Sequence, residues 1–444
     1  MDTKLSRIAE VARNRPKERM TSLVHLLDKQ RLWDCHLEMQ GDKAAGVDGV
    51  TKAEYERELE SNLEDLLSRM KRQAYKPKPS RRTYIPKENG DKRPLGIPSY
   101  EDKLVQKAMS QILNAIYEEK FLPCSYGFRP GRSQHQALQA LDRLIMKQGV
   151  RYIVDVDIKG FFNYVDHEWL RQFLEHDIAD PNFLRLIGRF LKGGVMEEGF
   201  YQETEEGTPQ GGNLSPLLGN VYLHYVLDLW FEIEIKGKRC RGKAGMVRFA
   251  DDFVCGFERE EEAKAFYEAL EERMGKFNLT IAEEKAKLIR FGYGAEVDCK
   301  RAGLTKPATF DFLGFRHIWG RGKSGKYRLL RKTSPKKFRL RVKEITQWAR
   351  QNRHQPEGMF VDSVRRKLRG HYQYYGVSDN WHGISRYYSL VLNAIWKWRN
   401  RRSQKRTFTL EKFKAFLARN PLPKPRITVN LYATVNGNLK SRMP

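Results

Sequence analysis

Residues 246–256 read MVRFADDFVCG, and the fold assignment starts from this segment. Two short apolar runs flank a tight turn, a pattern that predicts a β-hairpin with Asp251 and Asp252 at its tip. An Asp pair in a hairpin is often only a solvated turn, because Asp bonds its own backbone and tolerates unusual dihedral angles. Adjacent carboxylates repel each other, however, so the alternative is a turn that holds a divalent metal ion.

A second acidic strand is predicted upstream, at residues 151–158 (RYIVDVDI). Its alternation places Asp155 and Asp157 on one face. A carboxylate at the end of one strand and a pair at the turn of another form the minimum set for two-metal phosphoryl transfer, in which the ions lie about 3.5–4 Å apart. Asp157, Asp251 and Asp252 are therefore the predicted catalytic acids. Asp155 lies farther from the reacting end, and we interpret it as structural, because buried acids are seldom unpaired.

Several motifs accompany the acids. DIKGFF occupies residues 157–162, GTPQGGNLSPLLGN residues 207–220 and FADD residues 249–252. In this order and spacing they resemble the reverse transcriptases encoded by bacterial group II introns. The likeness covers residues 44–432 and includes four outer blocks: RTYIPKENGDKRPLGIP at 82–98, SYGFRPGRS at 125–133, FDFLGF at 310–315 and LRGHYQYYG at 368–376. Phe249 replaces the commoner Tyr, and Asn163 stands where many relatives carry Asp; neither departure touches the predicted acids.

The resemblance implies an α+β fold: a right-hand polymerase with fingers and an antiparallel palm sheet, followed by a helical thumb/maturase bundle. It divides the chain into a helical N-terminal extension (1–45), fingers and palm (46–318), a thumb/maturase RNA-binding domain (319–404) and a basic C-terminal tail (405–444). It also implies two Mg²⁺ ions held by Asp157, Asp251 and the backbone carbonyl of Ile158.

A nucleotide site is expected on a basic hairpin. Asn89-Gly90 is a strong hairpin turn signal, and it places Lys87 and Arg93 on paired strands within reach of a triphosphate. Arg suits phosphate as a planar fork and Lys as a point charge. An ordinary solvated basic hairpin is the alternative.

Three other residues complete the nucleotide site by resemblance. Phe162 is expected to block a ribose 2′-hydroxyl, the group that distinguishes RNA from DNA; the alternative is a core ring, as we expect for Phe161. Gln210 is expected to line the nucleotide pocket, in a glycine-rich loop whose backbone can approach a base pair closely. Lys285 matches a lysine proposed to protonate pyrophosphate, although a surface lysine explains it equally well.

The net charge of +27 is distributed unevenly over the 444 residues. Residues 321–444 hold 31 Lys and Arg against 5 Asp and Glu, which predicts a module that binds a polyanion. Its interleaved aromatic residues suit structured RNA, but helical spacing predicts that most of them pack a bundle. The predicted RNA-binding residues are basic positions of this module: Arg365, Arg366, Lys367, Arg369, Lys397, Arg399, Arg401 and Arg402.

Composition excludes other classes. No signal peptide and no apolar run long enough for a bilayer is present, so no membrane partner is expected. The five cysteines form no CxxC pair, which argues against a zinc ribbon or a disulfide framework and fits a bacterial cytoplasm. The glycine-rich residues 316–327 are expected to form a linker. The HNH-type endonuclease domain of many relatives is expected to be missing, so that mobility takes its primer from another source.

These features favour an RNA-directed DNA polymerase that also binds its group II intron RNA and assists splicing and mobility. Its expected partners are the intron RNA, an RNA template with a DNA primer, dNTPs and a DNA target. Two alternatives stay open: a free-standing reverse transcriptase in host repair or phage defence, and a non-catalytic RNA splicing factor on the same scaffold. Genome context separates the first two, and the intact acids argue against the third.

Overall fold

The computed structural model describes residues 3–86, 92–208, 211–284, 286–322, 324–401 and 408–432. The chain forms two compact units. The first unit comprises residues 1–133, 154–255 and 261–287, and the second comprises residues 134–153, 256–260 and 288–444.

The first unit begins with helices that pack around a long apolar helix. They are α1 (Thr3–Asn14), α2 (Lys29–Glu38), α3 (Lys52–Glu56), α4 (Leu59–Lys71) and α5 (Tyr100–Tyr117). Asp28 starts α2 by accepting the Arg31 backbone N–H, and a Thr51–Glu54 capping box starts α3. α1 and α2 contact α5, whose core-facing side chains are completely buried.

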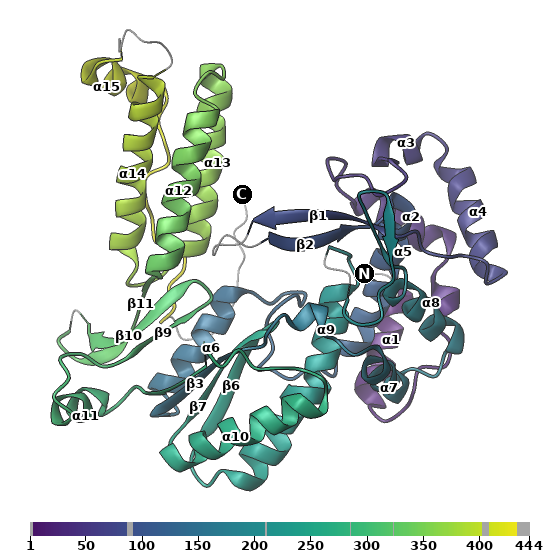
Figure 1. Cartoon of the computed structure of the whole chain (residues 1–444), viewed down its shortest axis with the longest axis horizontal. Helices are drawn as coiled ribbons and strands as arrows, with labels where there is room; N and C mark the ends of the chain where they lie inside the picture. The colour runs from purple at the N-terminus through teal and green to yellow at the C-terminus, as the bar shows by residue number, and fades with distance from the viewer. Residues whose placement is uncertain are drawn as a thin grey trace. The chain divides into compact units, whose positions relative to one another are not determined.

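A four-stranded sheet in the first unit has the order β2-β1-β4-β5. Its strands are β1 (Ser80–Pro86), β2 (Lys92–Ile97), β4 (Val195–Glu197) and β5 (Phe200–Gln202). β1 and β2 pair antiparallel, with Arg93 opposite Ile85, and form the projecting hairpin of Figure 1. The predicted basic hairpin is thus confirmed, although the turn residues Asn89 and Gly90 lie outside the described ranges.

The predicted acidic strands meet in a second sheet, of order β6-β7-β3-β8. Its strands are β6 (Ala244–Phe249), β7 (Asp252–Phe257), β3 (Tyr152–Asp157) and β8 (Lys287–Arg290). The accompanying helices are α7 (His167–Asp177), α8 (Pro181–Leu191), α9 (Ser215–Leu223) and α10 (Glu260–Lys276), with a 3-10 turn at Phe161–Asn163 and π-helical segments at His224–Asp228 and Phe231–Arg239. Phe266, Leu270 and Met274 of α10 are buried at helical spacing.

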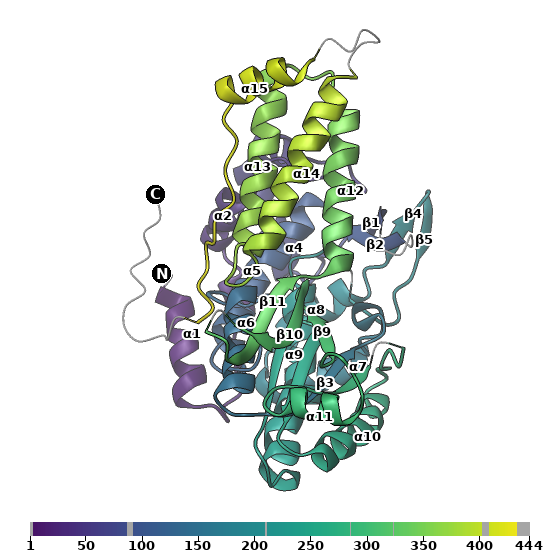
Figure 2. The same cartoon turned by 90° about the vertical axis from the view of Figure 1, so that its left-hand side faces the viewer.

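The second unit combines a small sheet with a helical bundle. Its elements are α6 (Gln134–Met146), α11 (Ala295–Arg301), β9 (Thr309–Phe312), β10 (Phe315–Arg321), β11 (Tyr327–Thr333), α12 (Pro335–Gln351), α13 (Glu357–Tyr375), α14 (Trp381–Arg399) and α15 (Leu410–Arg419). Figure 2 shows α12, α13 and α14 as long helices side by side, and α14 contacts both of the others. Ser334 caps α12 by accepting the Lys337 backbone N–H. The aromatic residues of α12–α14 differ in burial: Phe360, Tyr372, Tyr375 and Tyr387 are buried, Trp381 and Trp396 are exposed, and the others are partly buried.

The prediction that residues 316–327 form a linker is wrong. Residues 315–321 and 327–333 form the antiparallel hairpin β10–β11, with Phe315 opposite Thr333 and Arg321 opposite Tyr327. The apolar side chains of β10 alternate, and Phe315 and Trp319 are buried. Glycine and basic residues at the turn and on the outer face hid this alternation.

These helices and largely antiparallel sheets, in which β1 and β4 form a parallel pair, confirm the α+β fold class. In the described part of the chain, no helix combines the length and the apolar character that crossing a bilayer requires.

Candidate active site

The predicted acidic turn connects β6 to β7 through Ala250 and Asp251. Ala250 has φ +59°, a left-handed conformation that costs an L-residue roughly 1–2 kcal/mol. Gly127 lies against the turn so closely that a Cβ there would stand 2.3 Å from the Ala250 backbone nitrogen. Only glycine therefore fits at position 127, within the sequence block at residues 125–133. Strained backbone of this kind concentrates at functional sites.

A buried polar network holds the strained turn. The Arg248 guanidinium donates to both carboxylate oxygens of Asp228, over 2.7 and 2.5 Å, and also to the carbonyl of Ala250 over 2.9 Å. Asn220 accepts a hydrogen bond from Arg248 over 3.0 Å and donates to the Gly127 carbonyl over 2.7 Å. The sequence blocks at residues 125–133, 207–220 and 246–256 thus meet next to the turn, through Gly127, Asn220 and Arg248.

The structure brings Asp157 and Asp251 together. Burial raises the pKa of the Asp251 carboxyl, and the negative charge of Asp157 raises it further, whereas Arg93 and Arg248 lower it. Asp252 begins β7 and is partly exposed, while the next residue, Phe253, points into the core. A neighbouring negative charge that opposes the ionisation of Asp251 creates a site that a cation would stabilise.

The carbonyl of Ile158 faces the same region. Ile158 and Ile281 form an antiparallel bridge, in which Lys159 donates to Thr280 and Ala282 donates to Asp157. This flanking pattern makes Ile158 and Ile281 a non-hydrogen-bonded pair. The N–H and C=O of Ile158 therefore point away from Ile281, to the side of β3 where β7 lies.

These donors fit magnesium. Within the described ranges, no group of three or more His, Cys, Asp or Glu side chains is arranged to hold a metal ion by itself. Magnesium does not require such a group, because it prefers hard oxygen ligands and usually takes one or two carboxylates together with water and substrate phosphates. The carboxylates of Asp157 and Asp251 and the Ile158 carbonyl are ligands of this kind.

Of the two cations predicted to bind the triphosphate, Arg93 lies within the described residues. It is exposed on β2, and its charge acts on the Asp251 carboxyl. A phosphate between the hairpin and the acids would therefore meet one guanidinium beside the metal ligands. Lys87, the other predicted cation of this hairpin, lies outside the described residues.

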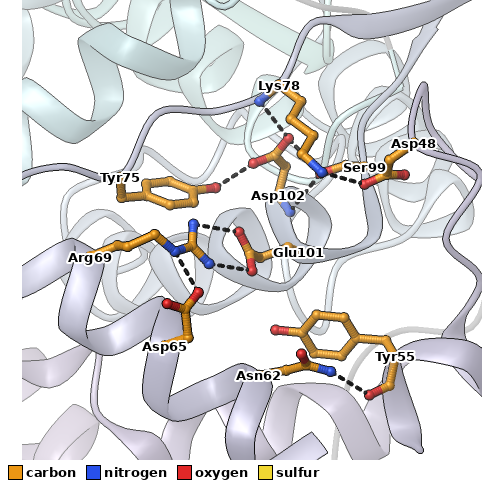
Figure 3. A network of polar contacts seen from close by, with 10 residues as sticks. All are labelled: Asp48, Tyr55, Asn62, Asp65, Arg69, Tyr75, Lys78, Ser99, Glu101 and Asp102. Atoms are coloured by element: carbon orange, nitrogen blue, oxygen red, sulfur yellow. Dashed lines mark hydrogen bonds and ion pairs between the residues drawn. The ribbon is translucent and has the colours of Figure 1, made fainter. Parts of the chain in front are cut away.

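A buried carboxylate, Asp102, ties together the two ends of the hairpin that carries Arg93 (Figure 3). Asp102 accepts hydrogen bonds from the Lys78 backbone N–H (3.0 Å), the Ser99 hydroxyl (2.6 Å) and the Tyr75 hydroxyl. Lys78 precedes β1, and Ser99 follows β2. One side chain thus fixes where both strands leave the body of the unit.

Phe162 and Phe161 differ in burial. Phe161 is 2% exposed and packs edge-on against Tyr222, whereas Phe162 is only partly buried. The Thr208 N–H donates to the Phe162 carbonyl over 2.8 Å, and a Cβ at Gly219 would touch both rings at 3.0 Å. The core position predicted for Phe161 is confirmed, and the gate role of Phe162 stays a prediction.

The glycine-rich loop packs on the hairpin. Gly211 has φ +118°, and a Cβ there would stand 2.5 Å from the Gly96 carbonyl of β2. Two of the predicted nucleotide contacts, Gln210 and Lys285, lie outside the described residues.

The predicted RNA-binding residues occupy different environments. Arg366, Lys367 and Arg369 on α13, Lys397 at the end of α14, and Arg401 are exposed. Arg365 is half-buried and donates to the Pro421 carbonyl over 3.1 Å. Arg402 lies outside the described ranges.

Arg399 packs inside the bundle. It is 7% exposed and donates to the carbonyls of Arg353 and Gln355 over 3.3 and 3.2 Å. Its guanidinium also lies 5.2 Å from the centre of the Phe360 ring. These contacts give Arg399 a structural role, and we leave it out of the proposed RNA-binding set.

The residues that support the site were not predicted. Arg248, Asp228 and Asn220 bear no catalytic pattern, but an arginine inside an apolar strand signals a buried partner. Asp102 had a clearer signal, since Ser99 followed three residues later by Asp102 is a capping-box pattern that marks a helix start.

Comparison with known proteins places this geometry in a family. Residues 85–317, more than half of the chain, match "Reverse transcriptase (RNA-dependent DNA polymerase)". The protein YkfC of Escherichia coli K12 is 31% identical over 342 residues, which cover 70% of this chain and 85% of YkfC. The chain belongs to the reverse transcriptase family. Membership carries with it the right-hand polymerase fold.

Two further proteins that are similar to this reverse transcriptase come from introns. The group II intron-encoded protein LtrA of Lactococcus lactis is 34% identical over 298 residues, 65% of this chain and 49% of LtrA. An uncharacterised 91 kDa protein in a cob intron of Schizosaccharomyces pombe is 36% identical over 202 residues, 45% of this chain and 25% of that protein. The chain thus spans about half the length of LtrA.

Proposed function

We propose that this protein is an RNA-directed DNA polymerase with Asp157, Asp251 and Asp252 as its catalytic acids. The observation that carries the proposal is the placement of Asp157 at the end of β3, which neighbours β7 in one sheet, next to the strained turn that carries Asp251. The charges of Asp157 and Arg93 both act on the Asp251 carboxyl. Family membership supports the same chemistry.

The primer 3′-hydroxyl would attack the α-phosphate of a dNTP in line, forming a new phosphodiester and releasing pyrophosphate. Arg93 and Lys87 bind the triphosphate. Phe162 excludes a ribose 2′-hydroxyl, Gln210 lines the nucleotide pocket, and Lys285 is a candidate proton donor to pyrophosphate. Asp157, Asp251 and the Ile158 carbonyl hold two Mg²⁺ ions, which would supply activation of the attacking oxygen and stabilisation of the leaving oxygen.

Primer extension tests this proposal. A DNA primer on an RNA template is incubated with dNTPs and Mg²⁺, and wild type is compared with Asp251→Asn, which keeps the size of the side chain. We expect extension by wild type and none by Asp251→Asn. Extension at the wild-type rate by the variant would refute the role of the turn, and inactivity of well-folded wild type would favour the non-catalytic splicing factor.

We also propose that the protein binds its intron RNA and assists splicing and mobility. The similarity to the intron-encoded LtrA and the strongly basic residues 321–444 support this role. RNA template with DNA primer, dNTPs and a DNA target are the remaining proposed partners. A cytoplasmic location belongs to the same proposal, and the five free cysteines support it.

Genome context tests the intron role. An intron-encoded protein lies within a folded ribozyme sequence, so we expect one on both sides of the coding region. Its absence would favour the free-standing polymerase instead.

A further inference from the structure

The second unit contains a groove of about 1080 Å³ between α12 and α14. Pro335 and His382 line one end, and Arg350 and Trp398 line the other, so the two helices run in the same direction. The groove follows α12 for about 22 Å, given a rise of 1.5 Å per residue. It is distinct from the exposed α13 residues that the sequence suggested for RNA binding.

Cations dominate the groove. Five Lys and Arg side chains line it: Lys332, Arg339, Lys343, Arg350 and Arg386. All five residues are exposed, and in the described part of the chain none of them has an ion-pair partner. Asp379 is the acidic residue in the lining, and it accepts a hydrogen bond from the Tyr432 hydroxyl. The groove therefore attracts a polyanion.

Aromatic rings lie among these cations. The Arg386 guanidinium lies 5.4 Å from the centre of the Phe338 ring, and that of Arg350 lies 5.5 Å from the centre of the Trp398 ring. Val342 adds an aliphatic surface between the two ends. Phe338 and Trp398 are partly buried. Cations next to such rings suit nucleotides, because the phosphates meet charge while the bases pack on rings and guanidinium planes.

The width of the groove selects among nucleic acids. α12 and α14 pack directly against each other, so the groove is a furrow along their shared surface and not a gap between them. A volume of about 1080 Å³ over a length of about 22 Å leaves a cross-section of roughly 50 Å², which admits one strand. A duplex is recognised across its outer surface, by shape and by backbone contacts. We propose that the α12–α14 groove binds unpaired nucleotides of a folded RNA. This proposal deepens the RNA-binding role and rests on it, but it is independent of the polymerase chemistry.

A matched pair of double variants tests the groove. Arg339→Gln/Lys343→Gln removes two cations from it, and Arg366→Gln/Arg369→Gln removes two exposed cations from α13. Both are compared with wild type for binding to a single-stranded RNA and to an RNA duplex with the same number of phosphates, at several salt concentrations. Thermal melting checks that the variants are folded.

We expect the groove variant to weaken single-strand binding more than the α13 variant does. Its salt slope on single strands should fall by roughly 1.4, which is two lost contacts at about 0.7 each. Phe338→Leu, which keeps an apolar side chain, should weaken single-strand binding by roughly fivefold or more and leave duplex binding unchanged.

Three outcomes would overturn the proposal. They are unchanged single-strand affinity in the folded groove variant, equal losses in the groove and α13 variants, and equal weakening of duplex and single strand. Asp251→Asn should bind RNA as wild type does. RNA binding by the groove can therefore be tested even if the polymerase proposal fails.

Discussion

The guanidinium of Arg248 and the carboxylate of Asp228 form a bidentate ion pair, and both side chains are completely inaccessible to solvent. Arg248 precedes the strained Ala250 by two residues, and Asp228 lies in a π-helical segment that follows α9. Such local π-helix is frequent at functional sites. The pair thus connects the π-helical segment that follows α9 to the turn that carries Asp251.

Removing one member of the pair should destabilise the protein strongly. Asp228→Asn leaves a buried guanidinium without its counter-charge, and we expect a loss of about 3–5 kcal/mol in the free energy of unfolding. Chemical denaturation measures it. Glu234→Gln, which breaks the exposed i,i+4 pair with Lys238, is the control and should cost less than about 1 kcal/mol. Equal losses in the two variants would mean that the buried pair has no special role.

Asp102 should affect substrate affinity more than the chemical step. Asp102→Asn weakens the tie between the ends of the β1–β2 hairpin, so Arg93 would be held less accurately against the triphosphate. We expect the KM for dNTP to rise between severalfold and roughly 100-fold, with little change in kcat. Steady-state primer extension measures both. Asp65→Asn, at the exposed rim of the network in Figure 3, is the control and should change neither. A fall in kcat alone would contradict this positioning role.

Phe162 should set the preference for deoxynucleotides. Phe162→Val replaces the ring that we propose to contact a 2′-hydroxyl with a smaller side chain. The ratio of kcat/KM for dNTP to kcat/KM for the matching rNTP should therefore fall by about tenfold or more. Single-nucleotide incorporation with each substrate measures the ratio. Phe161→Leu should lower stability and leave the ratio unchanged, because Phe161 lies in the core. An unchanged ratio in Phe162→Val would make Phe162 a packing residue.

His371 should make the bundle sensitive to acid. Burial, helped by the nearby charge of Arg341, lowers the pKa of His371 to about 3, and the ring stacks on Tyr387. The folded state therefore binds this proton less readily than the unfolded state, where the pKa is about 6.5. The stability contribution is complete above pH 6.5 and is lost as the pH falls toward the folded value.

Between pH 7 and pH 5, wild type should lose about 2 kcal/mol more of its free energy of unfolding than His371→Phe does. Denaturation at the two pH values measures the difference, and the exposed His382→Phe is the control. Identical pH dependence of His371→Phe and wild type would show that this ring does not limit stability in acid.

Local patterns predicted the elements, because each pattern is a property of neighbouring residues. The two apolar runs around Asp251 predicted the β6–β7 hairpin, and helical spacing in residues 321–444 predicted the bundle of α12, α13 and α14. The glycines of residues 316–327 masked the strands β10 and β11, since glycine has no side chain to show a face.

The support of the site could not be predicted in the same way. Arg248 and Asp228 are 20 residues apart, and Asp102 joins Tyr75 and Lys78 across 27 and 24 residues. No local pattern specifies such partners, because burial decides them and burial depends on the whole fold. The groove between α12 and α14 is likewise a product of helix packing.

Metal-directed cleavage tests most directly whether Asp157 and Asp251 share a metal. Fe²⁺ in place of Mg²⁺, with ascorbate and peroxide, generates hydroxyl radicals that cut the backbone near the bound ion. We predict two cuts, one near residues 157–158 and one near residues 250–252, both suppressed by excess Mg²⁺ and both lost in Asp251→Asn. A cut near only one of the two acids, or cuts that persist in Asp251→Asn, would contradict a shared metal site.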